Sequence, residues 1–195
     1  MSGFERHVRS GAIIANFTGF EAELLRSLAS QLVELLRNEA AVPRDDVDPF
    51  EALMDFTGPT NAPEDPVLAR LFPTAYADDE EAASEFRRFT EGSLRDGKSR
   101  AAETIIDGLQ EAGLPSELTE DGLHFDVELD EATAETWLRS FTDLRLALAT
   151  RLGVEEGDEE RWYALPDDDP EAQAHDIYEW VGYLQETLVQ ALITP

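Results

Sequence analysis

Four titratable residues near the C-terminus form the densest candidate site in the sequence. Glu171, His175 and Glu179 recur at four-residue spacing, which places them on one face of a helix, with Asp176 beside them. Imidazole and carboxylate ligands together suit zinc or manganese. No matching histidine or acid pair elsewhere completes the set, and acids early in a helix also favour its positive N-terminal end. We therefore predict a solvated helix face, with no metal and no cofactor.

The residue types that commonly carry catalysis are scarce. The chain has no cysteine, and its three histidines, His7, His124 and His175, lie far apart in sequence. This composition excludes thiolate metal sites, cysteine nucleophiles and thiol redox switching. The sequence also lacks a Gly-x-Ser-x-Gly turn, a Ser-x-x-Lys pair and a glycine-rich phosphate loop. We predict a protein that is not an enzyme; a small enzyme or metal-dependent protein with a scattered site is the alternative.

A net charge of −28 sets the second constraint on function. Such a field repels phosphate backbones and anionic lipid, so we expect neither tight nucleic-acid binding by the chain alone nor membrane binding. Solubility and attraction to a basic partner both explain the acidity, and charge alone does not separate them. No apolar run is long enough to span a bilayer, and Met1–Arg6 lacks the layout of a signal peptide. We expect a cytoplasmic protein.

Residues 86–100 are the one region of opposite sign, with five cations and two acids. Arg88, Arg95 and Lys98 fall on one helix face, and Arg87 lies next to them. These cations could dock an acidic protein partner or a phosphate group. The alternative is internal: they neutralise the acidic stretch of residues 45–65 folded near them. We name Arg87, Arg88, Arg95 and Lys98 as the candidate partner-binding residues.

The elements that must position these residues follow from hydrophobic periodicity and capping signals. Residues 123–129 alternate apolar and polar side chains, which predicts a strand paired with an N-terminal hairpin built from residues 4–9 and 12–17. Phe86, Phe89, Ala101, Ile105 and Leu109 are the predicted buried side of the second helix, which Gly92 and Gly97 leave room to bend. Four main helices are predicted, at about 20–38, 78–112, 130–152 and 170–192, with an acidic loop at 155–169 before the last.

Residues 41–79 contain six prolines and form a proline-rich acidic belt. Short apolar helices are predicted within it at 50–56 and 67–72, because their apolar residues need a core. The whole chain, residues 1–195, is therefore predicted to be a single helical domain with a mainly α fold and a small antiparallel sheet.

Three segments of the chain carry a family resemblance. They are Asp65–Pro73 with Ala75–Tyr76, Trp137–Leu138 with Thr142–Leu148, and His175–Trp180 with Leu184–Gln185. In order and spacing they resemble an actinobacterial family, formerly of unknown function, that includes the oxidative-stress regulator AosR. These motifs are mostly apolar, so they specify the fold better than a mechanism, and no catalytic residue carries over.

The resemblance implies a cytoplasmic regulator that meets a stress sigma factor and supports expression of an alternative cysteine-biosynthesis pathway. It also implies oxidant sensing through cysteine thiols, which cannot operate in a chain without cysteine. We therefore predict a non-enzymatic regulatory protein that acts through protein–protein contacts. Family genes often lie near that of the proteolytic adaptor ClpS, so an accessory role in ClpS-linked proteolysis is a further alternative.

Overall fold

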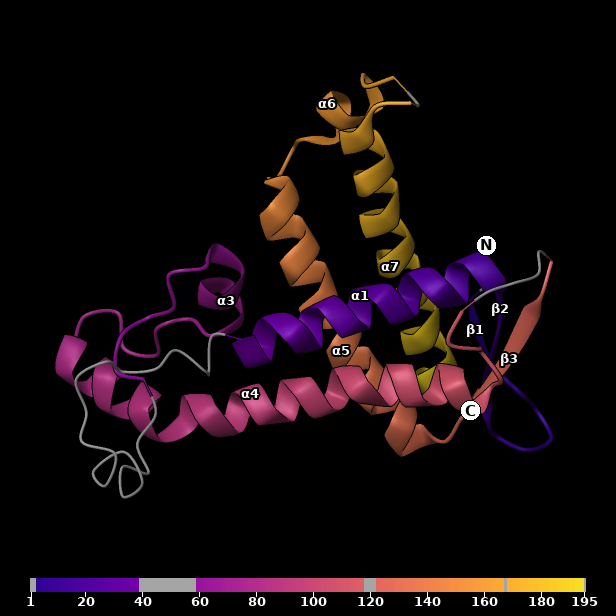
Figure 1. Ribbon diagram of the computed structural model, residues 1–195, viewed down its shortest axis with the longest axis horizontal. Helices are drawn as coiled ribbons and strands as arrows, with labels where there is room; N and C mark the ends of the chain where they lie inside the picture. The colour runs from indigo at the N-terminus through magenta and orange to yellow at the C-terminus, as the bar shows by residue number, and fades with distance from the viewer. Residues whose placement is uncertain (1–2, 39–58, 118–121, 167, 195) are drawn as a thin grey trace.

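The computed structural model describes residues 3–38, 59–117, 122–166 and 168–194. Three strands form one antiparallel sheet, and long helices pack beside it and against one another (Figure 1). This arrangement confirms the predicted mainly α fold with a small antiparallel sheet. The helices of the described residues are α1 (Gly19–Asn38), α3 (Pro66–Leu71), α4 (Glu80–Glu111), α5 (Glu131–Leu152), α6 (Glu159–Tyr163) and α7 (Pro170–Ile193).

The sheet joins segments that lie far apart in the sequence. Strand β2 (Ile13–Thr18) is central and pairs antiparallel with β1 (Phe4–Arg6) on one side and β3 (His124–Leu129) on the other. The predicted pairing of residues 123–129 with the N-terminal hairpin is confirmed. Every second side chain of β3 is buried, as the alternation predicted. β1 is shorter than predicted, because residues 8–10 belong to the turn.

Side-chain caps begin the helices close to the predicted residues. At α1, the backbone N–H of Glu21 donates to the Thr18 hydroxyl (3.2 Å), and the Glu21 carboxylate accepts the Thr18 backbone N–H (2.9 Å). This reciprocal pair is the predicted capping box. Asp130 and Asp169 each accept a backbone N–H at the start of α5 and α7, and Gly153 ends α5 with a φ of 64°.

Phe4 lies in an aromatic cluster at the centre of the core, and its strand is bonded to the last helix. The ring of Phe4 lies 5.9–6.0 Å from three other buried rings, those of Phe17, Trp137 and Phe141. The Phe4 backbone N–H donates to Thr187 Oγ1 (3.1 Å), and Arg6 Nε donates to the Ala191 carbonyl (2.9 Å). The first strand is therefore tied directly to α7, the last helix.

Helix α4 departs most from the prediction. It runs without a break through Gly92 and Gly97, and the predicted buried residues Phe86 and Phe89 are 44% and 65% exposed. Ala101, Ile105 and Leu109 are buried as predicted, but in the first half of the helix the buried residues are Ala83, Arg87, Glu91 and Arg95. This half faces the ends of two other helices, whose last carbonyl groups need donors. Arginines meet that need and phenylalanines do not.

Two further segments refine the sequence prediction. The acidic stretch 155–169 is not wholly loop, because it contains the short helix α6 with the buried Trp162. In the belt, α3 matches the helix predicted at 67–72, and its Leu68 and Leu71 are buried. The helix predicted at 50–56 lies outside the described residues.

The helices that the structure describes are all too polar or too short to cross a lipid bilayer.

Two glycines of α4 test the packing of α4 on α5. A Cβ at Gly108 would lie 2.8 Å from the ring of the buried Trp137, whereas a Cβ at Gly97 would meet nothing within 4 Å. We expect Gly108→Ala to destabilise the protein by about 1–3 kcal/mol through overpacking. Gly97→Ala should instead stabilise it by roughly 0.5–1 kcal/mol, because alanine favours helix. Urea unfolding measures both; equal shifts in the two variants would contradict the packing.

Candidate functional site

A buried ion triad occupies the inward face of α4. Glu91, which is 2% exposed, lies between Arg87 and Arg95, one helical turn away on either side. Its Oε2 accepts from Arg87 Nη1 at 2.6 Å, and its Oε1 accepts from Arg95 Nη2 at 2.7 Å and from Arg95 Nε at 2.9 Å. Because one carboxylate faces two guanidinium groups, one positive charge is left to be stabilised by other groups.

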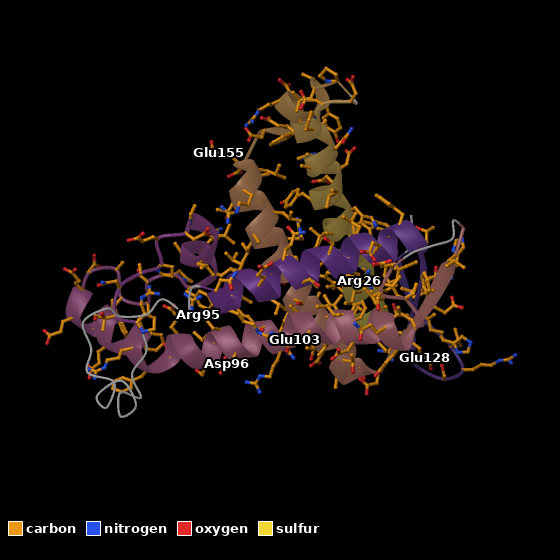
Figure 2. All side chains as sticks on the ribbon, viewed as in Figure 1. Arg26, Arg95, Asp96, Glu103, Glu128 and Glu155 are labelled. Carbon is orange, nitrogen blue, oxygen red and sulfur yellow. The ribbon has the colours of Figure 1, made fainter. Side chains whose placement is uncertain are left out.

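The two arginines also bind the C-terminal ends of two neighbouring helices. Arg87 Nη1 donates to the carbonyl of Phe72, the cap residue of α3, at 3.2 Å. Arg95 Nη1 donates to the Leu36 carbonyl, in the last turn of α1, at 3.3 Å. Arg95 lies between α4 and the end of α1 in Figure 2. Helix C-termini carry partial negative charge, so these contacts offset the residual positive charge of the triad.

The Phe72 ring and α5 complete the cluster. The guanidinium carbon of Arg95 lies 4.8 Å from the centre of the Phe72 ring, and Lys98 Nζ lies 6.0 Å from it. Lys98 Nζ also donates to the buried Asp143 of α5 at 2.6 Å. Three of the four candidate partner-binding residues, Arg87, Arg95 and Lys98, are therefore engaged inside the fold. Their carboxylate partners include Glu91 and Asp143; the part of the acidic stretch before residue 59 lies outside the described residues.

Arg88 is the exposed member of the four and belongs to an aromatic surface. Its guanidinium carbon lies 5.7 Å from the centre of the Phe89 ring, while Phe86 packs edge-on against Tyr76 at 5.9 Å. All three rings are substantially exposed. We call Tyr76, Phe86, Arg88 and Phe89 the aromatic patch. The two phenylalanines point outward because the triad points inward.

The histidine-containing face of α7 is divided among neighbouring contacts. The His175 ring stacks on Trp162 of α6 with centres 4.6 Å apart, and its Nε2 lies 3.9 Å from Glu179. Glu171 instead faces Arg161 at 3.5 Å. Among the described residues, no three His, Asp or Glu side chains gather closely enough to hold a metal ion.

The other two histidines lie on the sheet side, away from His175. His7 Nδ1 contacts Ser10 in the hairpin turn, and His124 Nδ1 contacts Asn16 across β2 and β3, both at 2.9 Å. Arg145 joins α5 to α7 by donating to Gln185 at 2.9 Å and to the Tyr178 hydroxyl at 3.3 Å. His7 thus makes its contact within the hairpin turn, His124 joins two strands, and Arg145 joins two helices.

Sequence reasoning missed the triad, although its signal was present. Arg87, Glu91 and Arg95 recur at four-residue spacing with alternating sign, which aligns them on one helix face. The partners in other elements, such as Asp143 and the ends of α1 and α3, depend on tertiary packing that no local pattern encodes.

Comparisons with known proteins agree with the resemblance seen in three segments. The model of a family described as a domain of unknown function, DUF2017, matches residues 1–192. A Mycobacterium leprae relative, whose name contains "oxidative stress regulator AosR", is 33% identical over 187 residues, covering 89% of this chain and 79% of its own. The "Oxidative stress regulator AosR" of Mycobacterium tuberculosis is 31% identical over 187 residues, covering 89% and 78%. No solved structure matches the chain.

The burial of Glu91 generates a stability prediction. Glu91→Gln removes the negative charge that both buried arginines share, so we expect the unfolding free energy to fall by about 3 kcal/mol or more. Glu85→Gln, the same change at an exposed position of α4, should alter the unfolding free energy by less than about 0.5 kcal/mol. Chemical denaturation gives both values. A Glu91→Gln protein as stable as Glu85→Gln would show that the triad does not hold the helix in place.

Proposed function

The chain belongs to the DUF2017 family, and on this premise we propose that it is a non-enzymatic regulatory protein of the oxidative-stress response that acts by binding another protein. Relatives that share about a third of its residues are named oxidative stress regulators. The observation that carries the binding role is the aromatic patch formed by Tyr76 and the N-terminal part of α4. Exposed aromatic rings with an adjacent arginine are the composition that protein interfaces favour.

The contact surface in this proposal is the patch, with Arg88 as its charged member. Phe89 is 65% exposed in the free protein and would lose that exposure on binding. Phe86 and Phe89 lie on α4, whose inward face is fixed by the triad, and Tyr76 packs against Phe86, so little order has to be gained on association. Arg87, Arg95 and Lys98 support the surface from inside, and Arg88 makes the direct contact.

The partner in this proposal is a stress sigma factor, and the regulated genes include those of cysteine biosynthesis. Direct recognition of promoter DNA is disfavoured by a net charge of −28, since every approach to phosphate is then repulsive. DNA association should arise only through the sigma factor. In this proposal the chain acts in the cytoplasm and changes transcription by binding the sigma factor.

A matched pair of phenylalanine variants tests the patch. Phe89→Ala should weaken binding to the purified stress sigma factor at least about tenfold, because interface aromatics carry a large share of binding energy. Phe20→Ala removes a ring that is 75% exposed at the start of α1 and should leave the affinity unchanged. Calorimetry with the full chain measures both. Equal affinities for the parent and Phe89→Ala would place the contact elsewhere, and no binding by the parent would rule out this partner.

Absence of cysteine generates a second prediction. The chain has no thiol for mild peroxide to oxidise; its oxidisable side chains are Met1, Met54 and less reactive groups. Affinity for the sigma factor should therefore not change after peroxide treatment. The treatment is applied to the regulator alone before mixing, so that any thiols of the partner stay unmodified. A change in affinity that dithiothreitol reverses would contradict the prediction.

A further inference from the structure

The outer edge of β3 presents unpaired backbone groups. β3 lies at one side of the sheet, since the strand order is β1-β2-β3. Gly19 N–H donates to the Leu123 carbonyl, and this bond shows which of the opposed residue pairs of β2 and β3 are the hydrogen-bonded ones. Because hydrogen-bonded pairs alternate along an antiparallel ladder, the backbone groups of residues 125, 127 and 129 bond to β2. The N–H and C=O groups of residues 124, 126 and 128 therefore point away from β2. Within the described ranges, no backbone group bonds to this outer edge.

A groove lies beside the second half of β3. Its volume is about 500 Å³, and it is bounded by β3, by the C-terminal half of α4 and by the start of α5. Ligand sites commonly enclose ~300–1,000 Å³, so the groove is large enough for a bound segment. Glu128 marks its position at the end of β3 in Figure 2.

The charge of the groove is of one sign. No lysine or arginine lines the groove. Its five carboxylates are those of Asp107, Glu111, Asp126, Glu128 and Asp130. None of them pairs with a cation of the described chain; Asp126 accepts a hydrogen bond from the Asn16 amide at 2.7 Å. The Thr133 backbone N–H holds the pKa of the Asp130 carboxyl below its ordinary value, so this group is charged at neutral pH.

From the free edge and the acidic groove beside it, we infer that β3 is a docking strand for an extended basic segment of a partner protein. Such a segment would add as a fourth strand, bonding to the backbone of residues 124, 126 and 128, while lysine or arginine side chains reach the carboxylates of α4 and β3. Main-chain bonds would supply affinity, and the charge of the groove would select the sequence.

A second copy of this chain is a poor occupant of the edge. Antiparallel pairing of two β3 strands would set Asp126 and Glu128 near their own copies, and like charges across a strand pair are destabilising. Charged side chains on an edge strand block such self-pairing. The same negative charges attract a basic strand. The acidity of β3 therefore disfavours pairing with a second copy and favours pairing with a basic partner segment.

This docking strand is separate from the aromatic patch. Phe89 and Asp107 are 18 residues apart on α4, which is roughly 27 Å along the helix axis at 1.5 Å per residue. The inference therefore goes beyond the proposed function and does not depend on the sigma factor. Phe89→Ala should leave peptide binding at β3 unchanged, so the two surfaces can fail independently.

The test uses the full chain and a short synthetic peptide of alternating lysine and valine. The peptide should bind and slow amide exchange at residues 124, 126 and 128, and a version N-methylated at its strand-pairing amides should bind at least tenfold more weakly. Asp107→Asn/Glu111→Gln should weaken binding at least tenfold. Glu81→Gln/Glu85→Gln, with the same spacing and charge change at the exposed start of α4, should not.

Three results would overturn the inference. Equal binding of the N-methylated peptide would show charge attraction without strand addition. Equal loss in the two double variants would show a response to net charge alone. Slow exchange at residues 124, 126 and 128 in the peptide-free chain, together with a dimer in sedimentation, would assign the edge to a second copy.

Discussion

The ion triad of α4 is the constraint on which the rest of the molecule depends. Glu91 pairs with two buried guanidinium groups, and those groups in turn bind carbonyls at the C-terminal ends of α1 and α3. Three helices are thereby fixed at one point. A buried charge cluster of this kind adds little net stability over an apolar core, but losing one member is costly, so it specifies one arrangement.

That arrangement decides what α4 presents to solvent. With Arg87, Glu91 and Arg95 turned inward, Phe86 and Phe89 must face outward, and a long helix carries an aromatic patch near one end and an acidic groove near the other. The aromatic cluster at the centre of the core packs β1 and β2 against α5, and β1 is also bonded to α7. Both proposed contact surfaces are therefore built on regular, well-packed elements, which suits a protein that binds partners.

Local patterns in the sequence predicted most of the framework. The Thr18–Glu21 box, Asp130, Gly153 and the Asp169-Pro170 pair marked helix ends because each satisfies backbone groups within a few residues. The alternation of apolar and polar side chains predicted β3, because one face of that strand is buried. The inward face of α4 was predicted wrongly at Phe86 and Phe89, because the apolar pattern was followed where the ends of α1 and α3 demanded hydrogen-bond donors. The pairing of Lys98 with Asp143 and the groove at β3 needed the three-dimensional packing.

Charge reversal at two arginines of α4 tests the central claim, that the helix divides its cations between an internal cluster and an external contact. Arg95→Glu sets a second carboxylate against Glu91 and should lower the unfolding free energy by about 3 kcal/mol or more. Arg88→Glu should leave that free energy within about 0.5 kcal/mol of the parent and weaken sigma-factor binding at least about tenfold. Stability and affinity measured on the same preparations separate the two roles. An Arg95→Glu protein that is as stable as the parent yet no longer binds the partner would contradict the account.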